Sequence, residues 1–531
     1  MAARFALLIA AILVAFGALA FRVYDLQIAR GGYYYAKAAS QAAAAKSSSG
    51  TRGAISFTDE NSVLLPAAVE QQFPVIYAVP TAIADPKAAA AEAAPILSVS
   101  AASLSQIFSK PNDSYELLIR KASPSAAQKI MDLDLPGLYA DYLPDRYYPL
   151  GPVASQALGY VGPNATSNAE SGHYGIESFY DNALADGTDV NLTIDPNIQI
   201  EAEKILDDLV QQNGATGGSV IVEDPETGKV LAMGATPDFD PNDYASSAIA
   251  SFLNPTVQSL YEPGSIFKVL TMAAGIDAGK ITPATTYDDL GYVNVNSAHI
   301  TNYNLDQHGA YGPGTTMTQV IEHSINTGAI FAENQIGNAL FTSYMKKFGL
   351  DEKTGIDLPG ELSGNLSELN PKARQVAFDT AAFGQGVAVT PIELVTAIAA
   401  IANGGTLMRP YLNAALGPKP LGRVVSASTA EQVTQMMVDA VDLAGVANIS
   451  GYSLAGKTGS AFIPDLVNGG YTDKLIDSYV GFGPTAHPRF IALIRLNTLP
   501  ETALAAQSVV PAFQALSQYI INYYNIPPDR L

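Results

Sequence analysis

The sequence predicts an α+β protein with more than one domain. Its 531 residues exceed the usual size of a single domain. From residue 188 onward, strand-like runs occur at both ends of a long helical middle, which is typical of one sheet that carries a helical insertion. Before residue 188, short strand-like runs alternate with Ala-rich helical ones. We therefore expect three parts, residues 1–25, 26–187 and 188–531.

The first part contains an uncharged apolar run from Phe5 to Phe21, which lies between Arg4 and Arg22. A helix rises ~1.5 Å per residue, so this run nearly crosses a hydrocarbon core of about 30 Å. We expect a single transmembrane helix with a short cytoplasmic tip. The alternative is a cleaved secretory signal, because Ala18 to Ala20 resembles a cleavage site. Both interpretations place the rest of the chain outside the cytoplasm.

Composition excludes several classes of function. The formal net charge of −21, from 50 acidic and 29 basic residues, argues against a nucleic-acid partner, which needs clustered Lys and Arg. The chain has no Cys, so it has no disulfide, no thiolate nucleophile and no Cys metal site. It has five His and neither a zinc-binding H-E-x-x-H motif nor a phosphate-binding loop. We therefore expect neither a metal nor a cofactor.

The second part, 26–187, shows no constellation of nucleophile and base, and we expect a structural or partner-binding role for it. The third part begins with a strand and an amphipathic helix, followed at residues 217–235 by two strand-like runs joined at a turn around Pro225 to Gly228. Strand-like runs return at residues 451–463, 477–485 and 489–497, before a closing helix over about 508–524. The apolar face of the amphipathic helix is predicted to consist of Ile198, Ile205, Leu206 and Leu209.

The segment YEPGSIFKVL, residues 261–270, is the first candidate for chemistry. A Pro-Gly pair predicts a turn before a helix, so Ser265 lies in the first helical turn and Lys268 on the same face. A Lys can accept the proton of a Ser only if its pKa is lowered, and the apolar neighbours at 266, 267, 269 and 270 would bury it. S-x-x-K alone is also compatible with a structural helix start, and it occurs again at Ser343 and Lys346.

Two further motifs follow S-x-x-K in the sequence, S-x-N at 324–326 and K-T-G at 457–459. A second S-x-N at 363–365 and a second K-T-G at 353–355 lie in polar, acid-rich loops, whereas the K-T-G at 457–459 lies within an apolar, strand-like run. S-x-x-K, S-x-N and K-T-G in this order are a signature of penicillin-binding proteins and serine β-lactamases. The three motifs comprise Ser265 and Lys268, then Ser324 and Asn326, then Lys457, Thr458 and Gly459, with Ser460 next.

From Arg4 to its C-terminus the chain resembles a class B penicillin-binding protein of the FtsI type, a monofunctional peptidoglycan D,D-transpeptidase. Two segments depart from the family pattern: DENSVLLPAA at 59–68 replaces a more usual run, and Ser460 stands where Thr is commoner. The further matching segments, in family order, are RGAI at 52–55, RYYPLG at 146–151, LGYVG at 158–162, YGIESFYD at 174–181, FGQGVAVTP at 383–391 and YVGFGPT at 479–485.

The resemblance implies an N-terminal anchor, an elongated α+β pedestal domain, and a transpeptidase domain with an antiparallel sheet flanked by helices and a helical subdomain. It also implies a role for each motif residue. Ser265 would be the nucleophile and Lys268 its base, and the peptide N–H groups of Ser265 and Ser460 would form the oxyanion hole. Ser324 would relay a proton, helped by Asn326 and Lys457. The hydroxyls of Thr458 and Ser460, with the Lys457 charge, would bind the substrate carboxylate. Gly459 would let the substrate backbone approach the strand closely.

The implied substrates are peptidoglycan stem peptides ending in D-Ala-D-Ala, with β-lactams as covalent inhibitors. The implied partners are a membrane glycosyltransferase of the FtsW or RodA kind and divisome proteins at the septum. The implied location is the cell membrane, crossed once, with the catalytic domain outside the cytoplasm. Three alternatives stay open: an elongation-specific transpeptidase, a D,D-carboxypeptidase or β-lactamase-like hydrolase, and an inactive divisome scaffold.

Overall fold

The computed structural model describes residues 2–24, 51–164, 170–296, 298–465, 467–500 and 505–530. Its first element is helix α1 (Ala2–Tyr24), which covers the predicted anchor. Within these described ranges, no helix combines the length and the apolar character that crossing a membrane requires. The transmembrane anchor therefore stays a prediction, and residues 25–50, which open the predicted pedestal, lie outside the described residues.

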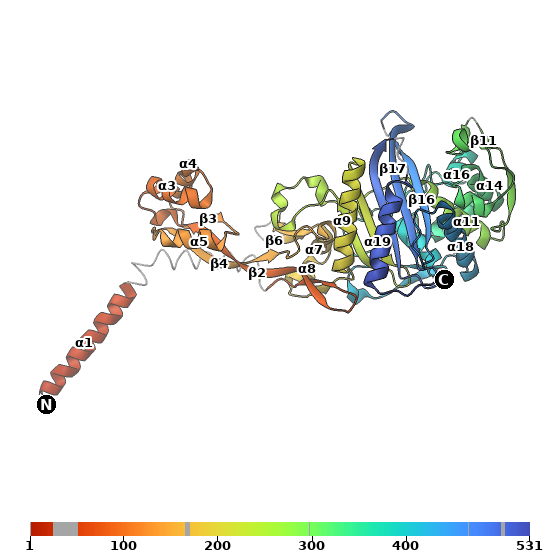
Figure 1. Cartoon of the computed structure of the whole chain (residues 1–531). Coiled ribbons are helices and arrows are strands. Elements are labelled where there is room, and N and C mark those ends of the chain that lie inside the picture. The colour runs from red at the N-terminus through yellow and green to blue at the C-terminus, as the bar shows by residue number, and fades with distance from the viewer. Residues whose placement is uncertain are drawn as a thin grey trace.

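A long two-stranded ribbon gives the front part of the chain its elongated shape (Figure 1). Strand β2 (Leu64–Ala78) pairs antiparallel with β4 (Leu138–Tyr147) from Val69↔Tyr147 to Ala78↔Leu138. At ~3.3 Å per residue, the 15 residues of β2 extend over about 50 Å. The far end of the ribbon adds β3 (Glu116–Ile119) and carries helices α3 (Pro86–Leu97), α4 (Ala101–Phe108) and α5 (Pro124–Asp132).

The near end of the ribbon is held by a buried ionic cluster. Arg52 Nε donates to Glu177 Oε2 at 2.9 Å, and Arg146 Nε donates to Glu177 Oε1 at 2.6 Å. Arg146 Nη1 also donates to Gly53 O at 2.8 Å. The side chain of Glu177 is fully buried, so its charge depends on these two partners. Three segments quoted for the family resemblance, near residues 52, 146 and 177, thus converge on one carboxylate.

The elements around this cluster connect the front part to the rest of the chain. Strand β1 pairs antiparallel with β2 and parallel with β7, so the two parts of the chain share one sheet. These connecting elements are β1 (Ile55–Thr58), α6 (Ser155–Leu158), β5 (Tyr160–Pro163), β6 (Glu170–His173), α7 (Gly175–Phe179), α8 (Asp181–Ala185) and β7 (Val190–Asn191).

The third part is built on one five-stranded antiparallel sheet, in the order β16-β17-β18-β8-β9. The predicted hairpin is confirmed as β8 (Gly217–Asp224) and β9 (Lys229–Thr236). Strands β16 (Ala455–Pro464), β17 (Tyr471–Gly483) and β18 (Phe490–Pro500) come from the other end of the domain, and β18 pairs with β8. Strands more than 200 residues apart in the sequence thus form one sheet, as an α+β domain with a helical insertion requires.

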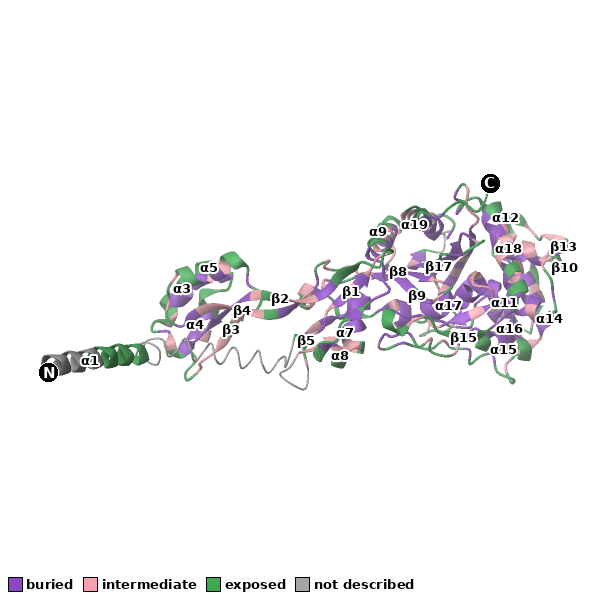
Figure 2. Cartoon of the chain, turned by 90° about the horizontal axis from the view of Figure 1, so that it is seen from below, coloured by how far each residue is buried: buried purple, intermediate pink, exposed green. Residues whose placement is uncertain are grey.

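Helices cover both faces of this sheet. One face is covered by α9 (Pro196–Asn213) and α19 (Val509–Tyr523), and the predicted apolar face of α9 packs there, with Ile198, Leu206 and Leu209 buried. The helices of the other face include α17 (Pro391–Ala402), α18 (Ala427–Ala444) and α11 (Phe267–Asp277), which share the larger hydrophobic core (Figure 2). Strand β16 is one of the two edge strands, and its outer edge is open to the helical subdomain.

The helical subdomain lies beyond β16 in Figure 1. Its helices and small hairpins carry the second motif and form the other wall of the site. The elements are β10 (Thr286–Asp289), β11 (Tyr292–Val295), β12 (Ala298–Thr301), α12 (Leu305–His308), β13 (Gly312–Thr316), α13 (Met317–Glu322), α14 (Asn326–Ile336), α15 (Asn338–Lys347) and α16 (Gln375–Ala381). Helix α10 (Pro255–Gln258) packs instead against α17, β8 and β9, and strand β14 (Thr406–Met408), which pairs with β15 (Pro420–Arg423), also packs against α17.

Candidate active site

The nucleophile candidate Ser265 lies in a tight turn pressed against the edge strand. A 3-10 turn over Gly264–Ile266 runs directly into α11, so Ser265 lies in the first helical turn, as predicted. Gly264 has a φ of +57°, and a Cβ there would lie 2.6 Å from Ser460 O. A side chain at this position would therefore be both strained and in collision with β16, so the turn needs glycine.

Gly459 on β16 also allows the strand to lie close to the turn that carries Ser265. A Cβ on Gly459 would lie 2.6 Å from Pro263 O. The FGQG segment supports the turn from behind, where Gly264 N donates to Gly384 O at 3.2 Å. The backbones around Ser265 and Ser460 are consequently neighbours, although 195 positions separate them in the sequence.

Lys268 lies one helical turn after Ser265, with Nζ 3.0 Å from Ser265 Oγ. Its side chain is fully buried, and all four apolar neighbours at 266, 267, 269 and 270 are also buried. Burial lowers the pKa of Lys268 well below its ordinary value, and the nearby Lys457 charge lowers it further. A Lys whose pKa is lowered in this way can accept the proton of Ser265.

Ser324 connects the two lysines. It lies between α13 and α14 with a φ of +56°, a left-handed conformation that is costly for a residue other than glycine. Its Oγ is 3.2 Å from Lys268 Nζ and 3.0 Å from Lys457 Nζ. Lys268 Nζ also donates to Ser324 O at 2.6 Å, which holds the strained residue in place. Ser265, Lys268, Ser324 and Lys457 thus form one hydrogen-bonded chain.

Lys457 projects from β16 into the same site and is only 4% exposed. Burial lowers its pKa to about 7, so it holds a proton about half the time at neutral pH. Its Nζ also donates to Thr458 O at 3.2 Å and to Thr458 Oγ1 at 3.3 Å. The site therefore contains a candidate nucleophile, a base with a lowered pKa and a second amine that can carry a proton to a leaving group.

Comparisons with known proteins agree with this arrangement. Residues 218–516 match the family model of the penicillin-binding protein transpeptidase domain, and residues 47–205 match that of the penicillin-binding protein dimerisation domain. The chain belongs to the penicillin-binding protein transpeptidase family. Its relatives place it in class B, with the FtsI type.

Relatives of this penicillin-binding protein cover most of its length. It is 30% identical to stage V sporulation protein D of Bacillus subtilis, over 83% of this chain and 73% of the relative. It is 28% identical to peptidoglycan D,D-transpeptidase FtsI of Escherichia coli K12, over 99% of this chain and 93% of the relative. The apo form of penicillin-binding protein 3 from Mycobacterium tuberculosis is 27% identical, with a TM-score of 0.65 over 72% of this chain and 92% of that one. The aztreonam complex of penicillin-binding protein 3 from Mycobacterium tuberculosis shares the fold of this chain. Its TM-score is 0.68 at 23% identity, over 90% of this chain and 97% of that one.

Two predicted site residues of this penicillin-binding protein make contacts that the sequence did not indicate. Asn326 begins α14, but its Nδ2 donates to Thr301 O at 2.9 Å and not to the chain of Ser and Lys side chains. The Ser460 hydroxyl donates to Asp477 Oδ1 at 2.6 Å. Asp477 was missed by the sequence analysis, and the only signal for it is an acid at the start of an apolar run on β17.

Glu262 is a second residue that the sequence analysis missed. Its carboxylate accepts Gly386 N at 3.0 Å, and Tyr471 Oη lies 3.0 and 3.2 Å from its two oxygens. Burial raises the pKa of Glu262. Tyr471 is the first residue of β17, so this contact fastens the start of that strand to the turn before Ser265. The acid in YEPGS was the available signal, but its partners lie 124 and 209 residues away.

The second copies of the motifs lie outside this network. Lys346 is exposed and pairs with Asp351 at 2.7 Å. In the second K-T-G copy, Thr354 Oγ1 donates to Glu361 at 2.6 Å. These two copies therefore make their own local contacts, apart from the hydrogen-bonded chain of Ser265, Lys268, Ser324 and Lys457.

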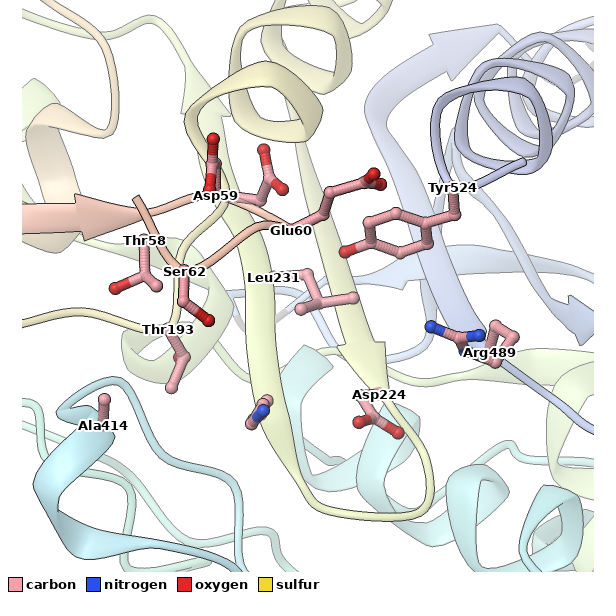
Figure 3. Close-up of a pocket in the computed structure, with 12 residues that line it drawn as sticks. Thr58, Asp59, Glu60, Ser62, Thr193, Asp224, Leu231, Ala414, Arg489 and Tyr524 are labelled. Carbon is pink, nitrogen blue, oxygen red and sulfur yellow. The ribbon is translucent and has the colours of Figure 1, made fainter. Parts of the chain in front are cut away.

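A pocket of about 390 Å³ lies away from the Ser265 site, where the loop after β1 meets the sheet (Figure 3). Glu60 of that loop points toward the Tyr524 ring, and Arg489 lies beside the same ring. None of the motif residues lines this pocket. It is a polar junction between the two parts of the chain.

Proposed function

We propose that this chain is a peptidoglycan D,D-transpeptidase that cross-links stem peptides at the division septum through an acyl-enzyme on Ser265. The observation that carries the proposal is the unbroken chain of contacts from Ser265 Oγ through Lys268 Nζ and Ser324 Oγ to Lys457 Nζ. Membership of the transpeptidase family and the relatives named as peptidoglycan D,D-transpeptidases support it.

The first half-reaction forms an ester and releases D-Ala. Lys268 Nζ takes the proton of Ser265 Oγ while Oγ attacks the carbonyl carbon of the penultimate D-Ala. The peptide N–H groups of Ser265 and Ser460 stabilise the oxyanion, and each such donor contributes roughly 3 kcal/mol to lowering the barrier. As the C–N bond breaks, the leaving amine receives a proton from Ser324 Oγ. Lys457 Nζ then donates a proton to Ser324 Oγ.

The second half-reaction forms the cross-link. The amine of a neighbouring stem attacks the ester carbonyl and loses its proton through Ser324 Oγ to Lys457, while Lys268 returns its proton to Ser265 Oγ as that oxygen leaves. A β-lactam enters the same first step, but its leaving amine stays attached in the opened ring. The acyl-enzyme of a β-lactam is therefore long-lived, and the protein is covalently inhibited.

The donor carboxylate is held by the Lys457 charge and the Thr458 hydroxyl, with Gly459 allowing the ligand backbone to approach the strand. Asn326 lines the side of the cleft near β12, where its amide is positioned by Thr301. We assign residues 1–25 to the membrane anchor, 26–187 to a partner-binding pedestal and 188–531 to the transpeptidase domain.

We also propose that α1 attaches the protein to the cell membrane, with the catalytic domain outside the cytoplasm. The described side chains of α1, residues 13–24, are all exposed and include Leu13, Phe16 and Phe21. Such apolar side chains favour a lipid environment over water. The proposed partners are a membrane glycosyltransferase of the FtsW or RodA kind and divisome proteins. Co-purification from membranes, with and without residues 1–24, tests these contacts.

The test of the activity is covalent labelling with a fluorescent penicillin. The wild-type chain is expected to be labelled, and Ser265→Ala is expected to be unlabelled although folded by circular dichroism. Labelling that survives Ser265→Ala, or that maps to Ser343, contradicts the assignment.

A donor peptide ending in D-Ala-D-Ala, supplied with an acceptor amine, separates the enzyme classes. Cross-linked product in excess over hydrolysed donor is the expected result. Hydrolysed donor with free D-Ala and no cross-linked product identifies a D,D-carboxypeptidase instead, and rapid turnover of the β-lactam identifies a hydrolase.

A further inference from the structure

Asp477 lies directly opposite Ser460, on the strand next to the edge of the sheet. The register of β16 and β17 pairs Ser460 with Asp477, so the two side chains lie on the same face of the sheet. Asp477 is fully buried, and its Oδ1 accepts the Ser460 hydroxyl at 2.6 Å. This short hydrogen bond is typical of a hydroxyl that donates to a carboxylate.

The second oxygen of the carboxylate is also satisfied. Ser508 Oγ donates to Asp477 Oδ2 at 3.1 Å, and Ser508 directly precedes helix α19. The N-terminal end of a helix favours a negative charge nearby. Burial raises the pKa of Asp477, and the two donated hydroxyls oppose that rise. Asp477 thus accepts one hydrogen bond from each of these two serines.

A Ser hydroxyl has one hydrogen, which it can donate to only one acceptor at a time. When Ser460 donates to Asp477, its Oγ offers only lone pairs to a bound ligand. The ligand carboxylate also has only acceptor atoms, so it cannot form a hydrogen bond with that hydroxyl.

Thr458 differs in this respect. It lies two residues earlier on the same face of β16, and its Oγ1 accepts from Lys457 Nζ at 3.3 Å. Its own hydrogen therefore stays available for a ligand carboxylate.

We infer that Asp477 is a specificity-determining positioning residue, which withdraws the Ser460 hydroxyl from the donor carboxylate and leaves carboxylate recognition to Lys457 and Thr458. This inference rests on the proposed function, because it concerns the same ligand in the same cleft. It replaces the role that the family resemblance implied for the Ser460 hydroxyl, and it leaves the role of the Ser460 peptide N–H unchanged.

The test separates initial binding of a carboxylate-bearing penicillin from the acylation step, by stopped-flow measurement over a range of penicillin concentrations with the full chain. In Asp477→Ala the Ser460 hydrogen is free, and the initial dissociation constant is expected to fall about fivefold, which corresponds to one ordinary hydrogen bond. The acylation rate constant is expected to stay within about twofold, because Asp477 does not touch the reacting atoms.

Two further variants exclude a structural or purely electrostatic effect. In a Ser460→Ala background, Asp477→Ala is expected to give no gain in binding, because the hydroxyl through which it acts is absent. Ser508→Ala removes the other hydrogen bond of the same carboxylate and is expected to leave the initial dissociation constant unchanged. Circular dichroism and thermal midpoints confirm that each variant is folded.

The inference is overturned if Asp477→Ala gives no tighter binding, or if its gain persists in the Ser460→Ala background. A poorly folded Asp477→Ala is replaced by Asp477→Val, which suits a strand and also removes the acceptor. Failure of the proposed function is distinguishable, because the wild-type chain would then not be labelled by the penicillin at all.

Discussion

Replacing Lys457 by Met is expected to stabilise the protein while it removes activity. Lys457 is only 4% exposed, and burial lowers its pKa from 10.5 to about 7. The difference between these two pKa values, at ~1.4 kcal/mol for each pH unit, means that burying Lys457 destabilises the folded protein by about 5 kcal/mol at pH 7. Met has a similar length and no charge. It loses the contacts to Ser324 and Thr458, at a cost of about 2 kcal/mol. The expected net gain at pH 7 is about 3 kcal/mol.

The sign of the pH dependence follows from proton binding. Between pH 7 and 10.5 the unfolded chain holds a proton on Lys457 that the folded chain has released, so wild-type stability rises with pH in this window. The advantage of Lys457→Met is therefore expected to fall by ~1.4 kcal/mol for each pH unit and to be close to zero near pH 9. Below pH 7 both states bind the proton, and the advantage stays constant.

Urea unfolding of the full chain at pH 6, 7, 8 and 9 measures this difference. Far-UV circular dichroism is the appropriate signal, because the chain contains no Trp. Lys346→Met is the matched control: Lys346 is 57% exposed, and its loss is expected to leave stability nearly unchanged at every pH. A Lys457→Met variant that is less stable at pH 7, or whose advantage does not change with pH, refutes the reasoning.

The same variant also tests the coupling between the two lysines. The Lys457 charge lowers the pKa of Lys268, so its removal is expected to raise the pKa of Lys268 toward the ordinary value. Any residual penicillin acylation in Lys457→Met should therefore reach half its maximum at a higher pH than in the wild type. An unchanged midpoint would show that the two amines do not interact.

Three further predictions concern the turn, the buried cluster and the second motif. Gly264→Ala is expected to slow penicillin acylation at least tenfold, because its Cβ would lie 2.6 Å from a strand carbonyl. Gly279→Ala is the control and is expected to leave the rate unchanged, because Gly279 has a similar φ of +65° but open space around it. Glu177→Gln removes the charge that pairs with the buried Arg146 guanidinium and leaves Arg52 paired with Asp181, and it is expected to cost about 3–5 kcal/mol in urea unfolding, against less than about 1 kcal/mol for Asp442→Asn in an exposed pair. Ser343→Ala is expected to retain full penicillin labelling, and loss of label there would contradict the choice of motif.

The local chemistry of the site could be predicted from the sequence. The spacing of Ser265 and Lys268 specifies one helix face, because a helical turn has a fixed geometry that needs no distant contact. The apolar neighbours of Lys268 indicated its burial, and the strand-like context of Lys457 distinguished the K-T-G that lies on β16 from the copy in an acidic loop. The hairpin at 217–236 and the amphipathic face of α9 were predictable for the same reason, since both depend on short-range periodicity.

Only the tertiary structure decided which partners these residues meet. Ser460 donates to Asp477 because two strands pair in one particular register, and a shift of one residue would place the two side chains on opposite faces. Asn326 donates to Thr301 because a hairpin 25 residues upstream packs beside α14. Strand register and helix packing depend on the whole core, so residues far apart in the chain can contribute to one site without any local pattern to reveal it. That is the physical reason why the candidate catalytic residues could be named from motifs, whereas the hydrogen bonds that orient them could not.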